Sequence, residues 1–180
     1  MSISAAESYG SDYSLESVLI ESERLNKSVE ARASVSDLDV YEHLDKPYLT
    51  ATLSLLDTAN IYAQMDLLGA ETVTIRIKST REGARAITKK FIITKVIVSQ
   101  KANESSDLLI IHLIQDIAYF SNLLNVNRSF TGNAHDIIQK ISENFLDNRE
   151  VVLGNRNPKQ NMKLIVPNMN PVEAMIWVKN

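Results

Sequence analysis

Alternation of apolar and polar residues between Leu38 and Lys78 is the clearest pattern in the chain. From residue 49 to residue 55 every odd position is apolar and every even position carries a hydroxyl group. The alternation returns at Val73, Ile75 and Ile77. A period of two predicts strands with one face in a core and one face in water or against a partner. Residues 57–60, with capping side chains, predict a short helical turn between these strands, so we expect an antiparallel sheet with a structured connection.

A change in the parity of the apolar positions predicts a bend further upstream. Residues 15–23 alternate loosely and are expected to form a strand. From Val29 to Val35 the apolar residues occupy odd positions, whereas from Leu38 onward they occupy even positions. Because a shift of one residue exchanges the two faces of a strand, we expect a β-bulge or sharp bend near Ser36–Asp37.

Two later segments are apolar on both faces. Residues 91–98 and 108–114 are nearly continuous in apolar character and are separated by a turn-like stretch. They predict a hairpin buried on both sides, either centrally in a closed barrel or beneath neighbouring subunits. The polar segment 80–90, with Gly83, is expected to be an exposed loop.

The pattern changes to a helical one in the last third of the chain. Apolar residues from Ala134 to Phe145 recur on one helical face, which predicts an amphipathic helix over 133–147. Asn170 and Pro171 predict the start of a further helix, which contains Trp177. Such an apolar helix needs a cover, so we expect the 180 residues to be the leading part of a longer polypeptide or to be completed by a partner.

These patterns place the chain in the α+β class, mainly β with α. We expect a flexible N-terminal arm over 1–14, an antiparallel β-barrel domain over 15–126, and the start of a second domain over 127–180.

Composition narrows the function classes. The chain has no cysteine, which excludes disulfides, cysteine-bound metals and a cysteine nucleophile. Its net charge of −3, with acids and bases intermixed, gives no polybasic footprint for nucleic acid or an anionic membrane. The sequence shows neither a cleaved signal nor a membrane anchor, and we expect neither.

Candidate chemistry is sparse. His43, His112 and His135 lie far apart in the sequence and in different expected elements, and the acids within residues 37–45 lack the spacing of a calcium loop. Nucleophile elbows, phosphate-binding glycine loops and dinucleotide fingerprints are absent from the sequence. We therefore expect no catalytic residue, no metal site, no cofactor and no enzymatic activity.

Five segments in order resemble the N-terminal region of the baseplate hub proteins of contractile-tailed bacteriophages. They are DVYEHLDKPYL (39–49), DTANI (57–61), GAETVTI (69–75), NRSFTG (127–132) and NPVEAMIWV (170–178). The chain is much shorter than these hubs, so their later domains are missing and the second barrel is expected to be incomplete.

The resemblance implies a structural role. Such hubs look like trimers in which each subunit supplies two tail-tube-like barrels, so that three chains form a pseudo-six-fold ring. The ring adapts the hexameric tail tube to the trimeric central spike, and DNA passes through its bore. The implied partners are the chain itself as a homotrimer, the tail tube protein, the central spike protein and other baseplate proteins, with DNA only in transit. The implied location is the virion tail baseplate, after assembly in the host cytoplasm.

Six residues are candidates for contacts with neighbouring subunits because of where they lie in the expected strands, loop and helix. Glu71 begins a strand, and the resemblance places an acid after the glycine there, so it is either an intersubunit or backbone-fixing acceptor or an ordinary exposed strand acid. A basic run on the 80–90 loop is either a contact with a neighbouring tail protein or a solvated loop. The candidate interface residues are Glu71, Arg81, Arg85, Lys89, Lys90 and Trp177. The alternative function is a small monomeric β-barrel module that binds another protein.

Overall fold

The structure is a computed structural model of the whole chain, and it describes residues 13–81, 83–103, 106–147, 151 and 160–179. Contacts between residues divide the chain into two compact units. The first comprises residues 1–41 and 50–115, and the second comprises residues 42–49 and 116–180. The boundary predicted after residue 126 remains a prediction, because a division by contacts alone does not establish which parts fold independently. The predicted N-terminal arm lies outside the described residues except for Tyr13 and Ser14, which begin a strand.

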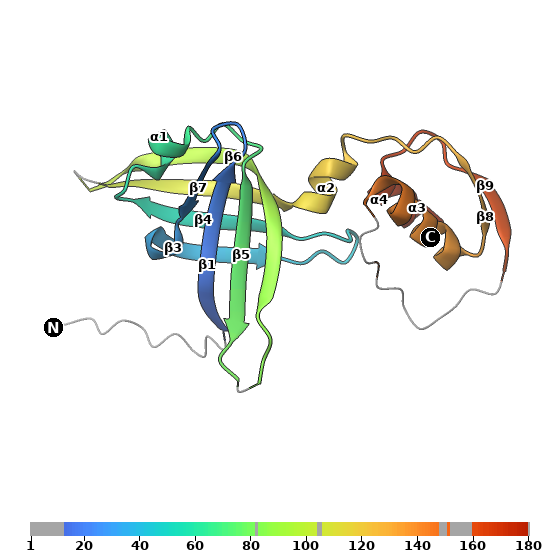
Figure 1. The fold of residues 1–180 in the computed structure, drawn as a ribbon, viewed down its shortest axis with the longest axis horizontal. Helices are drawn as coiled ribbons and strands as arrows, with labels where there is room; N and C mark the ends of the chain where they lie inside the picture. The colour runs from blue at the N-terminus through green and yellow to red at the C-terminus, as the bar shows by residue number, and fades with distance from the viewer. Residues whose placement is uncertain (1–12, 82, 104–105, 148–150, 152–159, 180) are drawn as a thin grey trace. The chain divides into compact units, whose positions relative to one another are not determined.

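The first unit is an antiparallel sheet of seven strands in the order β2-β1-β5-β6-β7-β4-β3 (Figure 1). This sheet and the helices of the chain confirm the α+β class. The strands are β1 (Tyr13–Ser22), β2 (Lys27–Glu30), β3 (Val35–Tyr41), β4 (Thr50–Asp57), β5 (Thr72–Ser79), β6 (Ile87–Asn103) and β7 (Ser106–Gln115).

The sheet is rolled into a barrel-like half-shell, because its two edge strands are consecutive in the chain. Only residues 31–34 separate β2 from β3, and such a link spans at most about 18 Å. The edges of a flat sheet of seven strands would lie about 29 Å apart. The link contains the short 3-10 turn η1 (Arg32–Ser34), and the Ala31 N–H donates to the Val18 carbonyl of β1 at 2.8 Å. The link therefore ties one edge of the sheet towards the other.

Alternation along the strands separates the barrel core from its outer face. Leu53 and Leu55 of β4 are fully buried, as are Leu109 and Ile111 of β7. The residues between them in sequence point outward, as the period of two requires. The remaining large core side chains come from β1, β5 and β6, namely Val18, Ile20, Val73, Ile75, Phe91 and Ile93.

The predicted bulge at Ser36–Asp37 is confirmed. Between Val35 and Asp37 the pairing of β3 with β4 shifts by one residue, so Ser36 is the extra residue. The strand expected to run from Val29 is instead interrupted by η1, which is where the chain crosses from one sheet edge to the other. The two alternating strands of the sequence pattern, β4 and β5, belong to one sheet but are not neighbours, because β6 and β7 lie between them.

The apolar hairpin is present as β6 and β7, which are the central strands between β5 and β4. It is not buried on both sides as predicted, because Ile97, Ile110 and Ile114 on its outer face are partly exposed. The predicted loop over 80–90 is too long at its C-terminal end. β6 already begins at Ile87, because this segment continues the ladder with β5 through the pair Ile77 and Ile87.

The second unit packs three helices and a two-stranded antiparallel sheet around a small core. It contains α2 (Asp116–Ser121), β8 (Ser129–Gly132), α3 (Ala134–Phe145), β9 (Met162–Ile165) and α4 (Pro171–Lys179). The helix predicted over 133–147 is present as α3, and Asn133 caps it by accepting from the Asp136 N–H at 2.9 Å. The core includes Val126, Phe130, Ile137, Ile141, Val166, Val172, Ala174 and Val178. Across the described residues, the structure has no helix long and apolar enough to cross a membrane.

Candidate functional site

The connection between β4 and β5 covers one end of the barrel. It contains α1 (Ile61–Met65), whose Ile61 and Met65 are buried. The Asp57 carboxylate at the end of β4 accepts from the N–H groups of Ile61 at 2.6 Å and Tyr62 at 3.0 Å. A carboxylate that accepts from the free N–H groups at the start of a helix stabilises that start. The predicted capping of this turn is therefore confirmed, and the capping side chain is that of Asp57.

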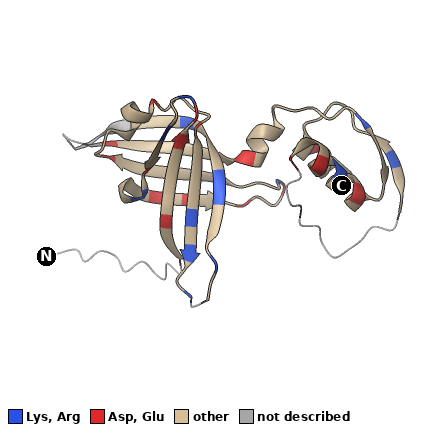
Figure 2. Cartoon of the chain, viewed as in Figure 1, with Lys and Arg blue, Asp and Glu red and all other residues tan. Residues whose placement is uncertain are grey.

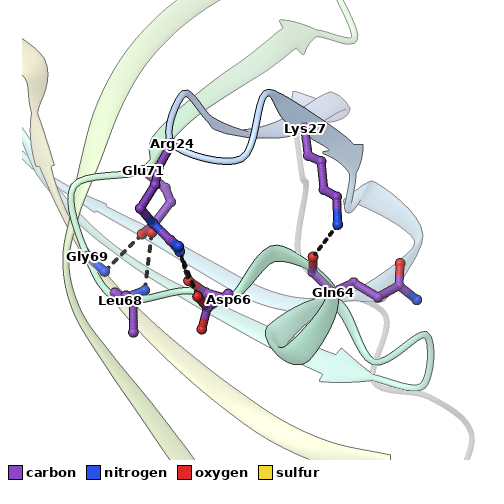
Figure 3. A network of polar contacts seen from close by, with 7 residues as sticks. All are labelled: Arg24, Lys27, Gln64, Asp66, Leu68, Gly69 and Glu71. Carbon is purple, nitrogen blue, oxygen red and sulfur yellow. Dashed lines mark hydrogen bonds and ion pairs between the residues drawn. The ribbon is translucent and has the colours of Figure 1, made fainter.

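Glu71 fixes the other half of this connection. Its side chain is only 5% exposed, which rules out the interpretation as an ordinary exposed strand acid. The Glu71 carboxylate accepts from the N–H groups of Leu68 at 3.1 Å and Gly69 at 2.9 Å (Figure 3). Hydrogen bonds to a charged acceptor are stronger than those between neutral groups. Glu71 is therefore a backbone-fixing residue, and its contact with another subunit stays a prediction.

The backbone that Glu71 holds is strained. Asp66, Gly69 and Ala70 all have positive φ angles, of 45°, 104° and 70°. Left-handed conformations are unfavourable for residues other than glycine and persist where surrounding contacts determine them. The Ala70 N–H also donates to the Ile93 carbonyl at 2.8 Å, which joins the turn to β6.

The β1–β2 turn holds the same connection from its other side (Figure 3). The Arg24 guanidinium contacts Asp66 twice, at 2.9 Å to the carboxylate and 2.7 Å to the backbone carbonyl. Lys27 donates to the Gln64 carbonyl at 3.4 Å. Two segments about forty residues apart in sequence are thereby linked at one end of the barrel.

This end presents apolar side chains on a fixed backbone. Leu68 is 72% exposed and Tyr62 is 38% exposed, while Leu67 between them is buried. An exposed leucine whose own N–H is held by Glu71 loses little backbone freedom when it binds, which favours a contact site. Leu68 could not be found from the sequence pattern, because one exposed apolar residue in a loop has no period.

The basic run does not form one surface. Arg81 and Arg85 lie in the β5–β6 loop, whereas Lys89 and Lys90 belong to β6, and all four side chains are exposed. Lys89 pairs with the inward-facing Ile75, and Lys90 pairs with the outward-facing Thr74. Successive residues of a strand point to opposite faces, so the two lysines are separated in space by the pleat.

Trp177 lies on α4 and is 45% exposed. The helix nevertheless has a cover within the chain, because Ala174, Met175 and Val178 are buried in the core of the second unit. The predicted cap is also confirmed, since the Glu173 N–H donates to the Asn170 side-chain oxygen at 2.8 Å. Trp177 remains available for a contact, which stays a prediction.

The second unit also has a surface pocket of about 260 Å³. Its lining is mixed and includes Lys46, Asn122, Glu173 and Ile176. Small-molecule sites usually measure about 300–1,000 Å³ and are mostly apolar, so this pocket has neither the size nor the lining typical of them.

Glu30 is the titratable residue that the structure perturbs most clearly. Partial burial acts to raise its pKa, but the hydrogen bonds from the Ser17 hydroxyl and from the Val18 and Arg32 N–H groups outweigh that effect, and the Arg32 charge adds to them. The pKa of Glu30 is therefore lowered. Its contacts join β1, β2 and η1, so this acid supports barrel closure. Within the described ranges, no group of three or more His, Asp or Glu side chains is placed to hold a metal ion.

No protein-family model and no curated protein sequence matches the chain. Among solved structures, the chain is similar to the tail protein from Neisseria meningitidis MC58, with a TM-score of 0.52 and 14% sequence identity. The similarity covers 91% of this chain and 43% of that chain, so this chain spans less than half the length of the tail protein. At this identity the likeness concerns the fold.

Proposed function

We propose that this chain is a structural, non-catalytic component of a phage tail. The observation that carries the proposal is the fold likeness to a tail protein, which extends over nearly the whole chain and both of its compact units. The five sequence segments that resemble baseplate hub proteins also support it. The fold alone does not define a function, so the proposal also rests on surfaces suited to assembly.

The specific form of the proposal is a baseplate hub. Three copies form a pseudo-six-fold ring that adapts the hexameric tail tube to the trimeric central spike, and DNA passes through the bore. The partners are the chain itself, the tail tube protein, the spike protein and other baseplate proteins, and the location is the virion tail after assembly in the host cytoplasm. Exposed apolar residues on both units support it, among them Leu68 and Trp177. The candidate contacts are Glu71, Arg81, Arg85, Lys89, Lys90 and Trp177.

Two measurements test the hub. Multi-angle light scattering gives the mass of the purified protein, which is expected to be three times 20.2 kDa. Electron microscopy of that species is expected to show a three-fold ring with a central opening. Co-sedimentation with the tail tube protein of the same phage tests the partner. A monomer that does not bind the tube protein would instead favour the monomeric binding module.

A further inference from the structure

The outer face of the barrel contains a partly exposed apolar band on the central strands β6 and β7. The outward residues of β7 are Leu108, Ile110, His112 and Ile114, and all of them are partly exposed. Ile97 of β6 lies beside Ile110 on the same face. An uncovered face of an antiparallel sheet is normally polar. An apolar face on central strands therefore indicates that another surface packs against it.

Charges of opposite sign flank this band. The strand register places Asp39, Thr52, His112 and Lys95 in one row across β3, β4, β7 and β6. Asp37 lies beside Asp39 on the outer face of β3, and Lys90 lies further along β6 (Figure 2 shows the charged positions along the strands). One flank of the face is thus acidic and the other is basic.

The two flanks cannot neutralise each other within one barrel. Three strand spacings separate Asp39 from Lys95, which is about 14 Å along the sheet. Among the described residues, neither the Asp39 nor the Lys95 side chain takes part in an ion pair such as those between Arg24 and Asp66 or Arg76 and Glu16. Because the sheet is rolled, β3 and the β5–β6 side lie on different sides of the barrel.

We propose that a second copy of this chain packs on this face, with the acidic β3 flank of one copy against the basic β6 flank of the next. Asp39 then lies beside Lys95 of the neighbour, and partly exposed apolar residues accompany the charges on both sides. Tyr41, which pairs with the outward-facing Thr50, is 47% exposed on the acidic flank, and Ile97 and Ile110 border the basic flank. Apolar contact supplies the burial, and the charges set the register.

This arrangement joins different surfaces of the two copies, so it is head-to-tail. A head-to-tail contact repeated by one rotation closes a ring when the rotation divides a full turn. The inference therefore rests on the proposed ring and specifies which surfaces form its seam.

Charge exchange tests the seam in the full chain. The single variants Asp39→Lys and Lys95→Asp each place like charges together, and we expect each to weaken self-association by about tenfold or more in sedimentation velocity. The double variant Asp39→Lys/Lys95→Asp restores opposite charges and is expected to recover association. Glu23→Lys, in the exposed β1–β2 turn, makes the same charge change as Asp39→Lys away from the face and is expected to leave association unchanged.

Three outcomes would overturn the seam, given that far-UV circular dichroism shows each variant to be folded. They are a monomeric wild-type protein at millimolar chain concentration, single variants that associate like the wild type, and a double variant that does not recover. A trimer whose association is insensitive to the charge exchanges would contradict the proposed seam but not the proposed hub. Association that responds to the charge exchanges as expected, but yields no three-fold ring, would support the proposed seam and contradict the proposed hub.

Discussion

The Glu71 carboxylate accepts a hydrogen bond from the backbone N–H of Gly69 at 2.9 Å, across a turn that reverses the chain immediately before β5. The acid is buried, while its neighbour Leu68 is the most exposed large apolar residue of this connection. A buried side chain, Glu71, and an exposed one, Leu68, thus lie within four residues of each other in the sequence. Glu71 links the stability of the barrel end to the geometry of a candidate contact.

The substitution Glu71→Gln is expected to lower the free energy of unfolding by about 1–3 kcal/mol, because a neutral amide cannot accept from both Leu68 and Gly69 with its two terminal atoms. Urea unfolding followed by circular dichroism measures the change. Asp66→Asn is the matched control, since its ion pair with Arg24 is about half exposed and such pairs contribute only about 0–1 kcal/mol. Equal losses in the two variants would contradict the role given to Glu71.

Two adjacent substitutions in the same turn are expected to have opposite signs. Gly69→Ala introduces a side chain at a φ of 104° and should destabilise the protein by about 1–3 kcal/mol. Ala70→Gly removes a side chain at a φ of 70°, where glycine is unstrained, and should be neutral or stabilise by up to about 1 kcal/mol. Thermal unfolding of the two variants measures both changes. A loss of stability in Ala70→Gly as large as in Gly69→Ala would show that the turn is unstrained.

Stability at acid pH is expected to depend on Glu30. Its folded-state pKa is lowered below its ordinary value of 4.5, so its ionised form stabilises the fold above that pH. The contribution is lost as the pH falls through the lowered folded-state pKa. The difference in unfolding free energy between wild type and Glu30→Gln should therefore be larger at pH 7 than at pH 3. Urea titrations at both pH values measure it, and a difference that does not shrink on acidification would contradict the account.

Fluorescence of Trp177 is expected to report assembly directly, because it is the only tryptophan in the chain and is 45% exposed. Removal of water from the indole on subunit contact should move its emission to shorter wavelengths as the protein concentration rises. Trp177→Phe gives the tyrosine background. Unchanged emission across the association transition measured by light scattering would place Trp177 outside the interface.

Local features of the fold could be derived from the sequence. The strands β4 and β5 follow from a period of two, the bulge at Ser36 follows from a change of parity, and α3 follows from an apolar face with a capping Asn133. Each of these depends on residues close together in the chain, where side-chain direction and capping are set by local geometry.

Tertiary structure alone decided how those elements combine. The sequence did not reveal that β6 and β7 separate β4 from β5, that Lys89 and Lys90 point to opposite faces of β6, or that Glu71 is buried. It also could not align Asp39 with Lys95, because that row depends on the register of four strands from distant parts of the chain. Strand order and register arise from long-range pairing and the closure of the barrel, and these have no period in the sequence.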